Sequence, residues 1–333
     1  MKVKVFKNNS QLLEIKEDWN KLFNEGSYSV FQSFDFCYES SLEKNLFIIC
    51  LIDGADIIEL WPCEIINRKL RFINDIHADF CDIITSSKSN AVVDYLNDLN
   101  LLGSLRFINL KTDSLVKNKL SKVIFYDLRN SINYSVLSLT KTEAFPANFN
   151  HFVYRQKRRL KRILNKYSTN HVLYTSSDSK FPLDEIINLK NKMISIKIRG
   201  NEFLDKSFLR FSERLFNSGK LIVSKIELEG EIVAISLLFK SDNYYSFWID
   251  LYTDLKMINL YHNTLFIKNI TEFSDATFNF GRGAYNYKVQ NFSPEVYVLE
   301  EFSTFNSSLE QKYFQFSKWL LSEITEIYKK IKY

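Results

Sequence analysis

Apolar positions in the first 145 residues alternate between strand-like runs and shorter stretches with helical spacing. Asp18–Phe23 and Asn90–Leu102 carry apolar residues at helical intervals, so we expect helices over one or both faces of a sheet. This pattern predicts a mixed α/β domain. Its predicted strands are Lys2–Phe6, Leu46–Ile52, Ile57–Ile66, Leu70–Ile73, Cys81–Thr85 and Leu105–Leu110.

A boundary is predicted at Thr140–Asn150, where Pro146 ends an extended segment and a long helix, Phe149–Tyr167, opens the second half. Three strands joined by short turns then imply antiparallel neighbours. Gly219 is placed as a helix C-cap. The other predicted helices are Leu183–Ile198, Lys206–Asn217, Asn259–Phe273 and Leu309–Ile331, and the strands are His171–Thr175, Lys220–Glu229, Ile232–Lys240, Tyr244–Tyr252, Thr277–Gly281 and Val296–Phe305.

Length and composition are typical of a soluble globular protein with two domains. The 333 residues exceed the size at which one core usually keeps growing, and 46% of them are apolar. A formal charge of +5 allows an anionic substrate but is modest for a nucleic-acid binder, so no nucleic-acid partner is expected. Asp53 and Asp56 interrupt the best apolar run, and the N-terminus lacks a signal-peptide pattern. We therefore predict a cytoplasmic protein without a membrane span.

The cysteines and histidines are dispersed singly. The cysteines lack C-x-x-C spacing and lie in apolar segments, which indicates buried, reduced thiols. The histidines lack metal-ligand spacing, so no metal site is predicted. These residues are Cys37, Cys50, Cys63 and Cys81, and His77, His151, His171 and His262.

The segment Phe278–Lys288 carries the most informative local pattern. Gly281 and Gly283 bracket Arg282, and glycine lets the backbone turn sharply and approach a ligand. Arg282 and Lys288 are candidate anion contacts at the end of a buried strand. The alternative is a hairpin turn with exposed cations. Tyr285 and Tyr287 lie beside Arg282 and are candidates for contacts with a sugar or base.

A basic run at Arg155–Arg162 places six cations in eight positions of the predicted helix. Arg158 and Arg159 are candidates for holding phosphates, because arginine binds them bidentately. A solvated helix face is the commonest explanation for such a run, and nucleic-acid binding lacks an accompanying stacking motif. Arg199, at the end of a predicted helix, is a further candidate substrate contact.

Asp79 and Asp82 lie three residues apart near an apolar strand-like segment, with His77 just before them. Carboxylates near a buried segment are costly unless they are paired or used. An amine that attacks a thioester must lose a proton, so these three residues are candidate bases. The structural alternative is that Asp79 caps a turn and Asp82 pairs with a nearby cation.

Three antiparallel strands, a helix that starts where the third ends, and a further strand follow the order of the GNAT acyltransferase core. The chain resembles the double-GNAT acyltransferases of the cellulose-biosynthesis and Fem-like type over nearly its whole length. The segments that carry this resemblance are Trp19, Phe31-Gln32-Ser33, Asp79-Phe80-Cys81-Asp82, Arg155–Arg162 and Phe278–Lys288.

The resemblance implies an α/β (α+β) fold of two tandem GNAT-like domains, each a mixed, largely antiparallel twisted sheet with flanking helices. We expect an N-terminal domain at residues 1–145, a donor-binding domain at 146–308 and a C-terminal helix at 309–333. Acyl-CoA is implied as co-substrate, without a permanently bound cofactor. The donor pyrophosphate would lie at a helix start that here lacks the usual glycine. Its residues are Asn259, Leu260, Tyr261, His262 and Asn263.

The function implied by this resemblance is N-acylation of the amino group of a nucleotide-linked amino-deoxy sugar, dTDP- or UDP-linked, for surface polysaccharide synthesis. The partners would then be a nucleotide sugar and acyl-CoA, and self-association into a homo-oligomer stays open. A Fem-like aminoacyltransferase acting on a peptidoglycan precursor is one alternative. A non-catalytic GNAT-like binding module is another, because the glycine-poor helix start is atypical.

Overall fold

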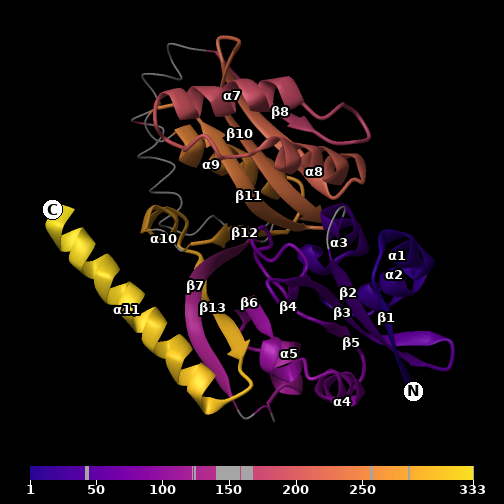
Figure 1. Cartoon of the computed structure of the whole chain (residues 1–333). Coiled ribbons are helices and arrows are strands. Elements are labelled where there is room, and N and C mark those ends of the chain that lie inside the picture. The colour runs from indigo at the N-terminus through magenta and orange to yellow at the C-terminus, as the bar shows by residue number, and fades with distance from the viewer. Residues whose placement is uncertain are drawn as a thin grey trace. The chain divides into compact units, whose positions relative to one another are not determined.

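The computed structural model describes residues 1–41, 45–121, 123, 125–139, 158, 168–255, 258–283 and 286–332 (Figure 1). The chain divides into two compact units. Unit 1 consists of Met1–Ser131 together with Val298–Tyr333, and unit 2 of Ile132–Tyr297. The last residues therefore return to the unit that contains the N-terminus. The predicted helix Phe149–Tyr167 falls almost entirely outside the described residues.

Unit 1 is built on an antiparallel sheet with the order β1-β2-β3-β4, in which β5 pairs with β3. The central strand β2 is buried over its first six residues, which explains its continuous apolar run. The predicted strand Cys81–Thr85 is wrong over most of its length, because only its last two residues pair with β3. The strands are β1 (Lys2–Phe6), β2 (Leu46–Asp53), β3 (Asp56–Ile66), β4 (Lys69–Phe72) and β5 (Ile84–Thr85).

Short helices flank this sheet, and several bury aromatic side chains. Trp19 has no exposed surface, and its indole N–H donates to the carbonyl of Gln32 at 3.0 Å. Trp19 also packs edge-to-face on Phe34. The helices of unit 1 are α1 (Asn9–Glu14), α2 (Lys16–Asn24), α3 (Phe34–Ser41), α4 (Ala91–Asp98), α5 (Leu115–Lys119) and the terminal α11 (Ser308–Lys332), with 3-10 turns at Val30–Gln32 and Leu102–Ser104.

Two long strands pass from one unit into the other along the chain. They are β7 (Tyr126–Leu139) and β13 (Glu295–Thr304). In unit 1, β13 pairs antiparallel with β6 (Arg106–Lys111). The sequence pattern did not reveal β7, because most of its first nine residues are polar or charged and it is largely exposed there.

Unit 2 contains a sheet with the order β7-β12-β11-β10-β9-β8. The predicted meander of three strands is confirmed, since β9, β10 and β11 pair antiparallel. Strands β11 and β12 are parallel, as the intervening helix α9 requires. The elements are β8 (Thr169–Tyr174), α7 (Leu183–Ser195), α8 (Lys206–Asn217), β9 (Leu221–Leu228), β10 (Glu231–Ser241), β11 (Tyr244–Tyr252), α9 (Ile258–Thr271), β12 (Ala276–Arg282) and α10 (Asn286–Phe292).

Helices α7 and α9 cover opposite faces of this sheet. Ser224 of β9 contacts His262 of α9, whereas the next residue, Lys225, contacts Glu185 of α7. Successive residues of a strand point to opposite faces, so the two helices lie on opposite sides. The predicted end of α8 at Gly219 is confirmed: the C-cap residue is Ser218, and Gly219 after it has a φ of 77° and donates its N–H to the Phe216 carbonyl.

An aromatic core joins β11, β12 and α9. Tyr245 stacks on Phe278 and Phe247 stacks on Phe280, with ring centroids 5.6 and 5.5 Å apart. Phe266 of α9 packs edge-on against this stack and is 1% exposed. The predicted mixed α/β fold with largely antiparallel sheets is confirmed. Over the described part of the chain, no helix is long and apolar enough to cross a membrane.

Candidate functional site

Strands β11 and β12 pair over only three residues each. They pair at Tyr244 with Thr277, Tyr245 with Phe278 and Ser246 with Asn279. Beyond Ser246, β11 runs on to Tyr252 while its other edge stays paired with β10. Among the described residues, the β12-facing edge of β11 therefore has no strand partner beyond Ser246, and an extended ligand can pair its own hydrogen-bonding groups with such an edge. We call this unpaired stretch the opening between β11 and β12.

The opening is accompanied by a β-bulge in β11. Leu238 pairs with Phe247 and Leu237 with Ile249, so Trp248 is an extra residue on this strand. Its indole ring packs on Phe208 of α8, with ring centroids 4.8 Å apart. A bulge increases the local twist of a strand, and this one lies where β11 leaves β12.

Helix α9 begins six residues after β11 ends and carries the five residues predicted to bind the donor. Leu260, His262 and Asn263 are buried, with 3% exposure or less, and belong to the interior of the unit. Asn259 is half-buried and donates from Nδ2 to Oδ2 of Asp250 at 3.3 Å. Burial raises the pKa of the half-buried Tyr261. Asn259 and Tyr261 are thus the two of the five that have substantial exposed surface.

Two histidines of unit 2 are joined through a serine. Oγ of Ser224 lies 2.8 Å from Nε2 of His171 on β8 and 2.8 Å from Nε2 of His262. Nδ1 of His171 contacts Nδ2 of the exposed Asn269 at 2.8 Å. Burial lowers the pKa of His262 to about 3, with a smaller contribution from the nearby His171, whose own pKa burial also lowers. His262 is therefore neutral at physiological pH.

The same hydrogen bonds continue from His262 to β11. Nδ1 of His262 lies 3.3 Å from Oγ of Ser236, and this hydroxyl donates to Oδ1 of Asp250 at 2.7 Å. Oδ1 of Asn263 is a more distant acceptor for it, at 3.4 Å. We call the set His171, Ser224, His262, Ser236 and Asp250 the histidine chain. Sequence reasoning missed it: polar residues inside three neighbouring apolar strands indicate buried polar groups, but they do not show which of these groups meet.

The segment Phe278–Lys288 is a strand followed by a helix, not a hairpin. Gly281 and Gly283 have φ values of 70° and 91°, so both occupy the region that favours glycine. Arg282, between them, is half-buried, and its backbone lies opposite Tyr134 in the antiparallel pairing of β12 with β7. Lys288 is 7% exposed, and its ammonium donates to the carbonyl of Phe280. Tyr285 and the side chain of Tyr287 lie outside the described residues.

The remaining predicted cations have different surroundings. Arg199 is exposed after the end of α7, with its guanidinium 5.1 Å from the ring centroid of Phe203. Arg158 is an exposed helical residue, and Arg159 lies outside the described residues.

In unit 1 the candidate base Asp82 is held by backbone groups. Its carboxylate accepts from the N–H groups of Ile83, Leu115 and Val116 at 2.8, 2.7 and 2.9 Å. Burial raises its pKa, and these hydrogen bonds oppose that shift. Asp79 is 5% exposed, and His77 is half-buried in the preceding turn. All three residues belong to unit 1.

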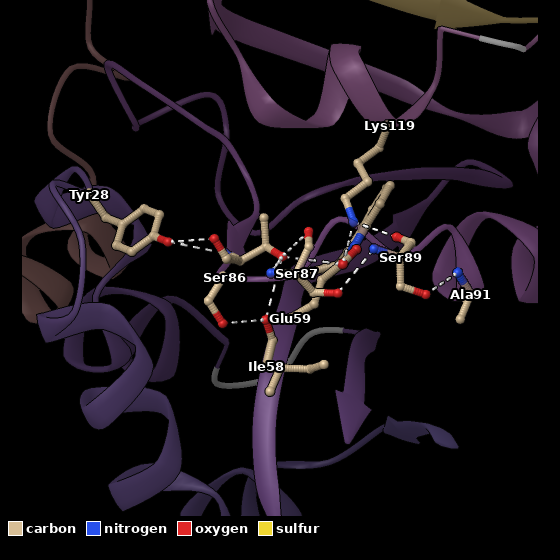
Figure 2. A network of polar contacts seen from close by, with 10 residues as sticks. Tyr28, Ile58, Glu59, Ser86, Ser87, Ser89, Ala91 and Lys119 are labelled. Atoms are coloured by element: carbon tan, nitrogen blue, oxygen red, sulfur yellow. Dashed lines mark hydrogen bonds and ion pairs between the residues drawn. The ribbon is translucent and has the colours of Figure 1, made fainter. Parts of the chain in front are cut away.

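Asp82 also lines a cavity of about 320 Å³ in unit 1. The ammonium of Lys111 lies 4.9 Å from the ring centroid of Phe80 at this cavity. The hydroxyl of Tyr28 donates to the carbonyl of Thr85 at 3.0 Å, which links the cavity wall to the polar network drawn in Figure 2. The other lining residues are Gly26, Ser27, Ser29, Gln32, Cys81, Asp113 and Leu115.

Comparison with known proteins identifies the fold class. A family model described as "Acetyltransferase (GNAT) domain" matches residues 150–289. Among solved structures, L-PGS from Bacillus licheniformis is 13% identical with a TM-score of 0.60, over 91% of this chain and 96% of that one. FemX is 10% identical with a TM-score of 0.60, over 93% and 99% of the two chains.

A third solved structure, a tandem GNAT protein from the clavulanic acid biosynthesis pathway, is 8% identical with a TM-score of 0.51, over 92% and 100% of the two chains. A search of curated proteins found no match. The protein therefore has the fold of the GNAT acetyltransferase superfamily, and its tandem form has structural counterparts. At these identities the likeness extends to the fold alone.

Proposed function

We propose that the protein is an acyl-CoA-dependent N-acyltransferase, which transfers an acyl group from a CoA thioester to an amine. The observation that carries this proposal is the opening between β11 and β12 next to the start of α9. A pantetheine arm is extended and carries amides that can pair with a strand edge. The first turn of a helix offers backbone N–H groups to a pyrophosphate. The family match over residues 150–289 supports the same reaction class.

For the acceptor we take the amino group of a nucleotide-linked amino-deoxy sugar, dTDP- or UDP-linked, of the kind used for surface polysaccharide. The sequence resemblance to double-GNAT acyltransferases supports this choice. Arg199 and Arg282 are candidate contacts for its pyrophosphate, because a guanidinium can bind two phosphate oxygens at once.

The acceptor amine attacks the thioester carbonyl, the C–S bond breaks, and the proton that the nitrogen loses passes to a base. His77, Asp79 and Asp82 are the candidates from unit 1. Asp82 accepts three backbone hydrogen bonds through its two oxygens, which favours an anchoring role for it. In unit 1, Asp79 and His77 therefore remain the candidates for the base, and activity measurements on their variants test this role.

The test is release of free CoA thiol, followed with a thiol-reactive dye. Purified protein is incubated with acetyl-CoA or longer acyl-CoAs and a panel of dTDP- and UDP-linked amino sugars. Thiol release that depends on both substrates, with the acylated sugar found by mass spectrometry, is expected. Acylation of other amines only would keep the reaction class and overturn the sugar assignment.

Binding of the donor is measured separately by calorimetry with CoA. A protein that neither binds CoA nor releases thiol with any acyl-CoA would overturn the proposal. Transfer from a charged tRNA to a peptidoglycan precursor would then establish the Fem-like alternative. Absence of both reactions would leave the non-catalytic binding module as the remaining alternative.

A further inference from the structure

The hydrogen bonds of the histidine chain have a fixed direction. A serine hydroxyl carries one proton, whereas a carboxylate only accepts. The hydroxyl of Ser236 lies closest to Oδ1 of Asp250, at 2.7 Å, so its proton points there. The contact between Ser236 and Nδ1 of His262 must then be one in which the imidazole N–H donates.

The same reasoning extends to the outer histidine. A neutral His262 that carries its proton on Nδ1 can only accept at Nε2, so it accepts from the hydroxyl of Ser224. Ser224 in turn accepts from Nε2–H of His171. Nδ1 of His171 is then the acceptor that faces the side-chain amide of Asn269. Every donor in the chain points toward Asp250, and both histidine tautomers are set.

The histidine chain lies where its burial would cost folding free energy if it served packing alone. Ser224, Ser236 and Asp250 are direct cross-strand neighbours on β9, β10 and β11, so three adjacent strands contribute polar groups to one row under α9. Ser224 and His262 have no exposed surface, and Ser236 is 1% exposed. Burial of such groups is costly unless they are bonded, and apolar side chains would fill the row without that cost.

No other described charge shares the row. Lys225, Glu185 and Glu227 form a separate cluster with N–O distances of 2.8 and 2.9 Å. They face α7, on the other side of the sheet. The titratable groups that face His262 are therefore His171 on β8 and Asp250 on β11.

Asp250 lies beside the proposed donor site. It is half-buried, four residues past Ser246, on the part of β11 that has left β12. Its Oδ1 is committed to Ser236, and its Oδ2 faces the Asn259 amide in the first turn of α9 at the longer distance of 3.3 Å. Oδ2 is thus the oxygen that a ligand amine at the opening can approach.

We propose that Asp250 is the proton acceptor of the acyl transfer, and that Ser236 and His262 are positioning residues that act through it. This rests on the proposed function. The amine forms the N–C bond with the thioester carbon and gives one proton to Oδ2 of Asp250, while the C–S bond breaks. Asp250 then returns this proton to the CoA thiolate, so the products are an amide and the free thiol. The one-directional chain holds Oδ1 in place throughout.

The first test needs no substrate. Protein labelled with ¹⁵N-histidine is measured by NMR from pH 8 to pH 5, and His262→Leu assigns the ring signals. We expect His262 to stay neutral with its proton on Nδ1, and His171 to carry its proton on Nε2 at pH 8. An Nε2–H tautomer of His262, or its protonation within this range, would overturn the direction of the chain.

The second test is the effect of each variant on kcat and on KM. Asp250→Asn should lower kcat/KM by about 10²-fold or more, the usual contribution of a general base. Ser236→Ala should lower kcat and leave KM close to that of the wild type, because Oδ1 of Asp250 then loses the hydroxyl that holds the carboxylate in place. His262→Leu should lower kcat in the same way but by less. His262→Asn, which keeps an amide N–H near Ser236, should lie closer to the wild type.

Ser212→Ala is the matched control, since Ser212 is a fully buried serine of α8 whose hydroxyl donates to the Phe208 carbonyl. It should lower stability without changing kcat. An unchanged kcat in Ser236→Ala, or full activity in Asp250→Asn, would overturn the proposal while acyl transfer itself stands. Failure of the wild type to transfer any acyl group would instead overturn the proposed function. The NMR measurement would still show whether the hydrogen bonds of the histidine chain run in the proposed direction.

Discussion

Lys119 and Glu59 form an ion pair in the interior of unit 1. The ammonium of Lys119 lies 2.7 Å from Oε2 of Glu59, whose side chain has no exposed surface. Oε1 of the same carboxylate accepts from the indole N–H of Trp61 at 2.7 Å, and Thr85 donates to Oε2 at 3.2 Å. Figure 2 shows Glu59 and Lys119 within a wider polar network that reaches Ser89. The pair ties the middle of β3 to α5.

Lys119→Met should destabilise the protein by about 3–5 kcal/mol, because it leaves the Glu59 carboxylate buried without its counter-charge. Urea unfolding measures the change. The double variant Glu59→Gln/Lys119→Met should recover part of the loss, since neither charge then remains. Lys21→Met is the control: Lys21 pairs with Asp56 at the surface, where both side chains are 62% exposed, and its loss should have little effect. Equal losses in the two single variants would contradict this account.

Asp82→Asn should lower the free energy of unfolding by about 1–3 kcal/mol. An asparagine side chain has one acceptor oxygen, so its NH₂ group would face at least one of the N–H donors of Leu115 and Val116. Urea unfolding and kcat are measured on the same variant. A large fall in kcat with unchanged stability would instead make Asp82 a catalytic base. Asp113→Asn, an exposed carboxylate at the same cavity, should change stability little.

The three-strand meander of unit 2 was predictable because its signals are local. Short turns at Gly230 and Asp242 separate apolar runs, and Gly219 marks the end of α8. A helix was predicted between β11 and β12, and the parallel pairing of these strands needs such a crossover. By contrast, β7 is half exposed and α10 is only seven residues long, so neither offered a hydrophobic period long enough to recognise.

The histidine chain was not predictable for a different reason. His171 and His262 are 91 residues apart, and what joins them is Ser224, which the register between β8 and β9 places near His171. Single serines within apolar strands carry no information about their partners until that register is known. The candidate donor residues Asn259 to Asn263 followed from their place in the fold, but which of them are buried depends on the side of α9 that meets the sheet.

Arg282→Ala should weaken substrate or donor binding and leave the thermal midpoint close to that of the wild type. Arg282 is half-buried at the end of β12, between two glycines that let the backbone turn there. Lys288→Met should have the opposite balance, because Lys288 is 7% exposed and its ammonium donates to the Phe280 carbonyl. We expect it to cost about 1–3 kcal/mol of stability. KM values and melting curves for both variants make the comparison, and a matching loss of stability in Arg282→Ala would mark that residue as structural.

The buried His262 should make the stability of the protein depend on pH. Burial lowers its folded-state pKa from 6.5 to about 3, so below pH 6.5 the unfolded chain binds a proton that the native protein does not. Stability is therefore full above pH 6.5 and falls as the pH decreases toward 3. At pH 5 the expected loss from this residue is about 2 kcal/mol.

The measurement is urea unfolding at pH 7.5 and pH 5.0 for the wild type and His262→Leu. The variant should show a smaller difference between the two pH values by roughly that amount, because leucine does not titrate while the other ionisable groups are common to both proteins. Phe266→Leu, at a buried and non-titrating position of the same helix, should be less stable at both pH values but keep the wild-type difference between them. Equal pH dependence in wild type and His262→Leu would mean that His262 is protonated in the native protein, which the direction of its hydrogen bonds to Ser224 and Ser236 does not allow.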